Sequence, residues 1–246
     1  MNDESARRPA SGFEGIWSAL RAQGYALTND RTISLPERIR ENVWQTYYNA
    51  ENLHHDPGDL PVDRERARDV IRYTWDEDIL RLESFDRITI TDRAGIPGER
   101  DHARVYLLKD PEAEELVRRL LRLVAPERRL IQGTFGVNLF RTYTNVVTTP
   151  HHDHEEYVIL YILDRIGDGA ETYLYKPEDV AEDGQILGEP ILTQQLNPGD
   201  MIIFEDRLFK HGTTPLVCPP GGSARRDALI CTFDYSTTYL GQAESV

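Results

Sequence analysis

A short stretch in the second half of the chain concentrates side chains that bind metal ions. Residues 150–156 read PHHDHEE and stand directly before an apolar segment that is typical of a β-strand. Residues two apart in an extended chain point to the same side, so His151 and Asp153 offer an imidazole and a carboxylate to one point. His211, in the later segment FKHG (209–212), is the expected third ligand.

Two histidines and one carboxylate on one face of a metal ion leave neighbouring coordination positions open, which is typical of non-haem Fe(II) oxygenases. Such positions let a bidentate 2-oxo acid and O₂ bind side by side. A cosubstrate such as 2-oxoglutarate also needs a cation for its distal carboxylate, and Arg225 and Arg226 begin the last apolar strand. A guanidinium group suits a carboxylate because it donates two parallel hydrogen bonds. Only one of the two can point inward, and the pattern does not choose between them.

Other chemistries are compatible with parts of this pattern. His152 and His154 lie on the opposite side of the extended segment and, with Glu156, resemble the ligands of a cupin-like metal-binding protein that turns over no 2-oxoglutarate. A zinc hydrolase can use the first three ligands but has no role for the downstream arginine. The sequence contains no Gly-x-Ser-x-Gly nucleophile motif, no P-loop and no Gly-x-Gly-x-x-Gly motif.

The composition limits the partners and the compartment. The chain has 246 residues, of which 39% are hydrophobic, and a formal net charge of −14. Such an acidic surface repels phosphate backbones and anionic lipids, so we expect neither a nucleic acid nor a membrane as partner. Two cysteines make no disulfide framework, and no apolar run approaches the ~20 residues that cross a bilayer. We expect a cytoplasmic protein with residues 1–12 as a flexible tail, and we leave a homodimer open.

The elements that must position these residues change in character along the chain. The first half predicts helices over 15–23, 36–48 and 111–124, the last one capped by Asp110. Residues 64–98 are ambiguous, with Ile88–Thr91 as their best strand. After Pro126, strand-like runs follow one another at 130–143, 157–163, 171–175, 191–195, 201–204 and 228–235. Short strands separated by turns predict an antiparallel jelly roll or barrel, with the helices packed outside it.

Three blocks of sequence resemble the bacterial 2-oxoglutarate/Fe(II) dioxygenases typified by L-isoleucine 4-hydroxylase. They are HHDHEEYV (151–158), HGTTPL (211–216) and RDALICTF (226–233), in the order that this family has. A weaker likeness covers FRTY (140–143), where the family has an arginine before the metal loop, and residues 52–104 depart most from the family. The resemblance implies a single dioxygenase domain over 1–246, mainly β with flanking helices, whose double-stranded β-helix (jelly-roll) core spans 126–236.

The resemblance also implies roles for particular residues. Fe(II) is held by His151, Asp153 and His211, and Arg226 rather than Arg225 binds 2-oxoglutarate, helped by the hydroxyl of Thr213. The expected reaction is the O₂-dependent hydroxylation of an aliphatic C–H bond in a free or modified amino acid, with succinate and CO₂ as by-products. Asp153 argues against a halogenase, which replaces that ligand with a small residue.

An amino-acid-like substrate needs a cation for its carboxylate and an acid for its ammonium group. Arg141 is the expected cation, because it lies on the strand that leads to the metal loop, and Glu156 or its neighbour Glu155 is the expected acid. A surface ion pair for Arg141 and solvated glutamates in a turn are the open alternatives. Asp227 is expected either to support Arg226 or to be a charge at the strand edge.

Overall fold

The computed structural model describes residues 12–55, 64–85, 89–90, 104–143, 148–233 and 238–239. Residues 1–11 of the expected tail lie outside this range, whereas Gly12 begins the first helix. Of the expected strand Ile88–Thr91, only Thr89 and Ile90 lie within it.

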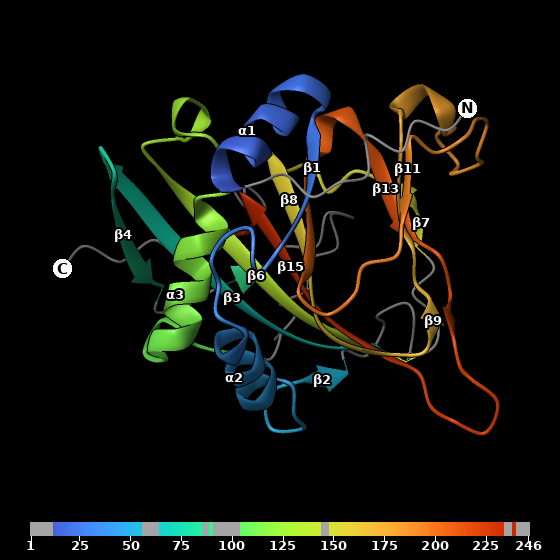
Figure 1. The fold of residues 1–246 in the computed structure, drawn as a ribbon, viewed down its shortest axis with the longest axis horizontal. Helices are drawn as coiled ribbons and strands as arrows, with labels where there is room; N and C mark the ends of the chain where they lie inside the picture. The colour runs from blue at the N-terminus through green and yellow to red at the C-terminus, as the bar shows by residue number, and fades with distance from the viewer. Residues whose placement is uncertain are drawn as a thin grey trace.

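The described strands form one large antiparallel sheet and a smaller one (Figure 1). The large sheet has the order β1-β12-β8-β15-β6-β3-β2, with β4 paired to the free side of part of β3. Its strands are β1 (Tyr25–Asn29), β2 (His54–His55), β3 (Arg64–Asp76), β4 (Ile79–Ser84), β6 (Gln132–Thr142), β8 (Tyr157–Ile166), β12 (Asp200–Glu205) and β15 (Arg225–Phe233).

The smaller sheet has the order β11-β10-β13-β7, and all of its pairs are antiparallel. Its strands are β7 (Thr148–His151), β10 (Thr172–Tyr175), β11 (Leu192–Gln194) and β13 (Lys210–Thr213). Two further pairs join β9 (Asp168–Gly169) to β14 (Leu216–Val217) and β5 (Thr89–Ile90) to β16 (Thr238–Tyr239). The fold is mainly β with few helices and is built from antiparallel sheets, which confirms the expected class.

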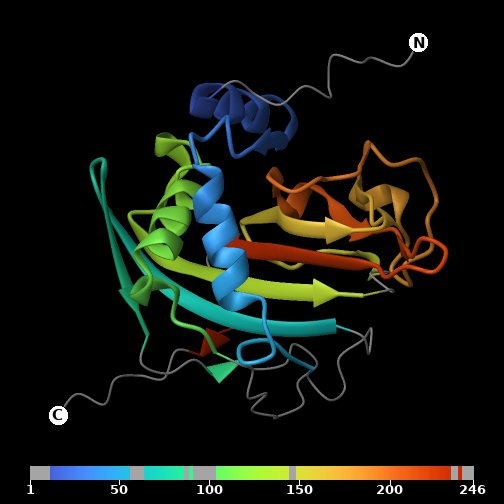
Figure 2. The same cartoon turned by 60° about the horizontal axis from the view of Figure 1, so that its bottom comes forward.

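Three helices, α1 (Gly12–Gln23), α2 (Glu37–Tyr47) and α3 (Pro111–Leu121), confirm the helical segments expected in the first half. Figure 2 shows α2 and α3 side by side across the strands of the large sheet. The carboxylate of Asp110 accepts hydrogen bonds from the N–H groups of Glu112 and Ala113, which caps α3 as expected. None of the described helices is long and apolar enough to cross a membrane.

The strand β8 shows how the sequence separates the two sides of the large sheet. Its residues alternate in direction, and Tyr157, Ile159, Tyr161 and Leu163 pack into a core shared with the three helices. The residues between them, Val158, Leu160 and Ile162, pack instead with apolar residues of the smaller sheet. One face of the large sheet is therefore covered by helices, and the other faces the smaller sheet.

Four strands of the large sheet, β1 to β4, come from outside the expected core of residues 126–236. The longest of them, β3, lies in the segment left ambiguous by its sequence. The face of β3 that looks toward the smaller sheet begins with Arg64, Arg66 and Arg68, which line a cavity there. Because these inward residues are charged, this part of β3 lacks the apolar side by which a strand is recognised.

Candidate metal centre and its cavity

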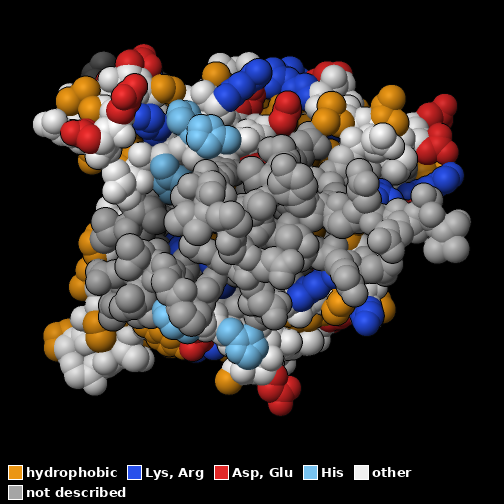
Figure 3. Space-filling view, turned by 180° about the vertical axis from the view of Figure 1, so that it is seen from behind, with side chains coloured by type: hydrophobic (Ala, Val, Ile, Leu, Met, Phe, Trp, Pro, Cys, Tyr) orange, Lys and Arg blue, Asp and Glu red, His pale blue; other side chains and the backbone are white. Residues whose placement is uncertain are grey.

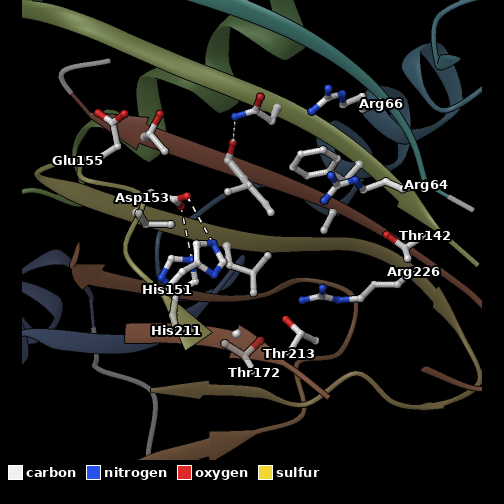
Figure 4. Close-up of a pocket in the computed structure, with 18 of the residues that line it drawn as sticks. Arg64, Arg66, Thr142, His151, Asp153, Glu155, Thr172, His211, Thr213 and Arg226 are labelled. Carbon is white, nitrogen blue, oxygen red and sulfur yellow. Dashed lines mark hydrogen bonds and ion pairs between the residues drawn. The ribbon is translucent and has the colours of Figure 1, made fainter. Parts of the chain in front are cut away.

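The three expected metal ligands converge between the two sheets. His151 ends β7 and is paired in register with His211 of β13, and Asp153 follows two residues after β7. One ligand atom from each of the three lies within 4.8 Å of the other two. Nε2 of His151 is 3.6 Å from Oδ1 of Asp153, and Nε2 of His211 is 3.4 Å from Oδ2 (Figure 4).

The charges of this cluster suit a divalent cation. Burial alone raises the pKa of Asp153, but hydrogen bonds with His151 and His211 outweigh it and hold the pKa well below its usual range. Burial likewise lowers the pKa of His211, but Asp153 and Asp206 outweigh it and raise the pKa to about 9. The carboxylate of Asp153 thus favours a positive charge beside it, which a bound metal ion supplies. The donor set of two imidazoles and one carboxylate fits Fe(II).

Asp206 connects the parts of this cluster and was not singled out from the sequence. It is fully buried after β12, where its Oδ1 accepts from the N–H of Asp153 at 3.1 Å and its Oδ2 from the N–H of Glu155 at 3.2 Å. Oδ1 also lies 3.5 Å from Nδ1 of His211. A single aspartate at a strand end carries no sequence signal for this role.

The competing set of His152, His154 and Glu156 does not assemble. Nδ1 of His152 lies 2.7 Å from the carbonyl oxygen of Asp206, and His154 and Glu156 are exposed. The metal-binding group found among the described residues contains none of the three. His154 has a φ of +63°, in the left-handed region, so the chain turns after Asp153. The side chains of the three residues therefore do not point to one site.

A cavity of about 340 Å³ lies between the sheets and contains the metal-binding side chains. Apolar residues, among them Val158, Leu160 and Phe204, form much of its wall. The side chain of His151 is 43% exposed, so the metal site is accessible from solvent at this residue. Figure 3 shows histidine side chains at the surface of one face of the molecule.

Arg226 enters the same cavity from β15. It is 5% exposed, and its Nη2 is buried without a hydrogen-bond partner among the described residues. Burial, followed by the charge of Arg165, lowers its pKa to about 10. Arg225 points the other way and pairs with Asp164 and Asp227. A buried guanidinium group that lacks an acceptor suits a carboxylate ligand, such as the distal carboxylate of 2-oxoglutarate.

Hydroxyl groups accompany this arginine. Thr213 of β13 is 8% exposed and lines the cavity, paired in register with Thr172 of β10, which also lines it. Thr142 of β6 is paired in register with Arg226. Figure 4 shows Thr213, Thr142 and Arg226 on the same side of the metal-binding group.

Two expected substrate residues do not reach the cavity. Arg141 lies between the inward residues Phe140 and Thr142, so it points to the other face and donates two hydrogen bonds of 2.8 Å to the carboxylate of Asp227. Asp227 is fully buried and also accepts from Trp44 of α2. The structure thus places Arg141 in a buried ion pair that joins the sheet to a helix.

The acidic residue that lines the cavity is Glu155 rather than Glu156. Glu155 is 5% exposed, whereas Glu156 is exposed and lies outside this cavity. The sequence also did not indicate the three arginines of β3 that line the cavity, because their strand was not recognised.

Comparisons with known proteins agree with this geometry. Residues 51–232, more than half of the chain, match the profile of a family described as 2OG-Fe dioxygenase. None of the curated proteins matches the chain significantly by sequence.

Several solved structures share the fold. A bsmA homolog from Methylobium petroleophilum PM1 is 20% identical with a TM-score of 0.69, covering 95% of this chain and 96% of the other. IDO from Bacillus thuringiensis is 17% identical with a TM-score of 0.62, covering 91% and 98%. The Fe(II)/α-ketoglutarate-dependent dioxygenase TqaL is 16% identical with a TM-score of 0.67, covering 90% and 86%.

Proposed function

Because this chain belongs to the 2OG-Fe dioxygenase family, we propose that it hydroxylates an aliphatic C–H bond in a free or modified amino acid. As a member of the family it is an oxidoreductase that uses Fe(II), 2-oxoglutarate and O₂. The observation that carries the proposal is that the His151–Asp153–His211 cluster and the buried Arg226 line one cavity between the sheets.

The residues of the cavity divide the work of binding. His151, Asp153 and His211 would hold Fe(II) on one face and leave its other positions open. Arg226 would bind the distal carboxylate of 2-oxoglutarate, and Thr213 would donate a further hydrogen bond to it. When bound, iron and 2-oxoglutarate supply the oxidation of a C–H bond by O₂, coupled to the loss of CO₂ and the formation of succinate.

The protein's own contribution is position and the exclusion of water. Asp206 fixes the backbone around Asp153 and the ring of His211, and both of these expected ligands line the cavity. Val158, Leu160 and Phe204 form an apolar wall there. A substrate carbon held against this wall lies near the metal while bulk water is kept from it.

Support for an amino-acid-like substrate comes from the sequence blocks at 151–158, 211–216 and 226–233. IDO, an isoleucine dioxygenase, is among the structures with the same fold. In place of Glu156, the buried Glu155 is the acidic group that would meet the substrate amine. The substrate cation is no longer Arg141, since that side chain is bound to Asp227 on the other face.

A turnover assay tests this function. The protein is purified without oxygen, supplied with Fe(II) and 2-oxoglutarate, and offered a panel of free and N-modified amino acids in air. We expect substrate-dependent succinate and a product heavier by one oxygen atom, both of which Asp153→Ala abolishes. His154→Ala is the matched control, because His154 is exposed and outside the metal-binding group. A panel that yields no substrate-dependent succinate contradicts the proposal.

Other properties expected from the sequence stay predictions. They are a single domain over residues 1–246, a cytoplasmic location, the absence of nucleic-acid and membrane partners, and a homodimer. Light scattering after size-exclusion chromatography measures the mass against the 28.2 kDa of one chain. Limited proteolysis that yields one resistant core supports the single domain.

A further inference from the structure

One wall of the cavity carries a row of positive charge that neither the metal nor 2-oxoglutarate explains. Arg64, Arg66 and Arg68 occupy alternate positions of β3 and all three line the cavity. They do so in a chain with a formal net charge of −14. Alternate positions of a strand point to the same side, so the three guanidinium groups face the space between the sheets together.

The strand register separates this row from Arg226. Arg64 of β3 is paired with Thr142 of β6, and Thr142 is paired in turn with Arg226 of β15. Since neighbouring strands lie about 4.8 Å apart, the backbones of β3 and β15 are about 10 Å apart. Arg64 is thus level with Arg226, whereas Arg66 and Arg68 lie progressively further along β3 from it, so the row extends beyond the position of a small dicarboxylate held by Arg226.

The arginines of this row are held in place by the strand beside them. Nε of Arg68 donates a 2.7 Å hydrogen bond to Oδ1 of Asn138, whose Nδ2 donates to the carbonyl oxygen of Ile230. The guanidinium carbon of Arg64 lies 4.7 Å from the centre of the Phe140 ring. All three arginines have further interactions within the protein. Stacking uses the flat face of a guanidinium group and not its N–H edge, so the stacked Arg64 is oriented for a planar anion.

We propose that Arg64 and Arg66 bind a carboxylate of the substrate, which makes this enzyme specific for acids that carry a free carboxylate away from the reacting carbon. The inference rests on the proposed function and names the group that the substrate must present. In Figure 4 these arginines lie at one end of the drawn pocket and Glu155 at the other, with His151, Asp153 and His211 between them. A carboxylate at the arginine end thus places the remainder of the substrate across the metal-binding group.

Binding to the Fe(II)- and 2-oxoglutarate-loaded protein under anaerobic conditions tests the inference. Isothermal titration calorimetry compares matched pairs of probes, such as L-leucine with L-leucinamide and N-acetyl-L-leucine with its amide, extended over the other side chains. Carboxylic acids without an amine, such as 4-methylpentanoate, complete the panel. We expect the acid of a matched pair to bind about tenfold or more tightly than its amide, since only the acid accepts charge-assisted hydrogen bonds.

The variants Arg64→Gln and Arg66→Gln should lower this preference for the acid to about threefold or less, while the affinity for 2-oxoglutarate stays unchanged. Arg72→Gln is the control, because Arg72 lies on the same strand, is 54% exposed and pairs with Glu83 outside the cavity. The thermal midpoint and 2-oxoglutarate binding of each variant show that it is folded.

The inference is overturned if acids and amides bind equally, if the preference survives both substitutions, or if no carboxylic acid binds. A loss of 2-oxoglutarate affinity in Arg66→Gln also overturns it, because the row then serves the cosubstrate. If amides are turned over as fast as acids, the proposed hydroxylation is supported but the specificity for a free carboxylate is refuted. Arg66-dependent binding of acids that lack an amine, without turnover of any amino acid, keeps the inference and refutes the amino-acid substrate.

Discussion

Asp206 contacts two of the three expected metal ligands and holds them in position. Its two oxygens accept from the N–H groups of Asp153 and Glu155 and face Nδ1 of His211. In Asp206→Asn an amide N–H replaces one acceptor and opposes a donor in the buried site. We expect the affinity for the metal to fall about 10- to 100-fold.

Titration of the metal-free protein with Co(II) measures this loss without turnover. Asp200→Asn is the matched control, because Asp200 lies on β12 and accepts a backbone hydrogen bond from Asn197 in a turn outside the cavity. If Asp206→Asn and Asp200→Asn bind Co(II) equally well, Asp206 does not position the ligands.

Substitution of the two neighbouring arginines at the start of β15 should affect the KM for 2-oxoglutarate differently. Arg226→Gln removes a buried guanidinium group whose Nη2 has no hydrogen-bond partner in the described part of the chain, so we expect the KM for 2-oxoglutarate to rise about 10- to 100-fold. Arg225→Gln breaks ion pairs with Asp164 and Asp227 outside the cavity and should leave that KM unchanged. Initial rates at varied 2-oxoglutarate concentration decide this, and an equal rise in both variants would refute the assignment of Arg226.

The convergence of the metal ligands could be predicted from the sequence because the pattern that indicates it is local. His151 and Asp153 are two residues apart beside a strand, so alternation places them on one side. The block around His211, which resembles the dioxygenase family, then indicates the third ligand. Arg141 shows where such reasoning stops. The sequence places it on the correct strand, but only the register of β6 against β15 shows that it points at Asp227.

At the scale of elements, β3 carries a buried acid on its helix-facing side, opposite to the face with the arginines. Asp69 is fully buried, where it accepts from the N–H groups of Val70 and Leu107, and it lies 3.6 Å from Arg104. Burial, only partly offset by these groups, raises its pKa to about 6. In the unfolded chain the same carboxyl titrates near its ordinary pKa of about 3.9.

This difference predicts a loss of stability as the pH rises. The folded state holds the proton of Asp69 more tightly, so its stabilising effect is complete below pH ~4 and is lost as the pH rises to ~6, by up to about 3 kcal/mol. In Asp69→Asn the step is absent. Urea unfolding of both proteins from pH 4 to 7 measures this step. Between these pH values the free energy of unfolding of the wild type should fall relative to that of the variant by this amount. Parallel pH profiles would contradict the raised pKa.

The elements themselves were predictable to the extent that one face of each is apolar. The helix α3 has a capping Asp110, a proline at its first turn and buried leucines at helical spacing, and it was predicted within a few residues. The strand β3 places three arginines toward a cavity and Ala67, Ile71 and Tyr73 toward the helices. Because charged residues of β3 line the cavity, its sequence looks like that of an exposed segment, and strand propensity does not distinguish the two.

At the scale of the whole molecule, the large sheet separates a side that stabilises the fold from a side that binds ligands. The helices pack on one face with a continuous apolar core (Figure 2), and the cavity with its charged groups lies on the other face. A sheet with its two faces divided in this way can vary the residues of the cavity with little change to the core, because adjacent residues of one strand belong to different sides.

Two adjacent residues of β8 test this separation directly. Ile159 is fully buried against the helical side, so Ile159→Ala should lower the free energy of unfolding by about 2–5 kcal/mol and leave the KM of the substrate unchanged. Leu160 lines the cavity, so Leu160→Ala enlarges an existing space and should cost less stability while it raises that KM several-fold. Urea unfolding and steady-state kinetics on both variants compare the two quantities. If Ile159→Ala raises the KM as much as Leu160→Ala does, the sheet does not separate the two sides, because a defect in the helical core then reaches the cavity.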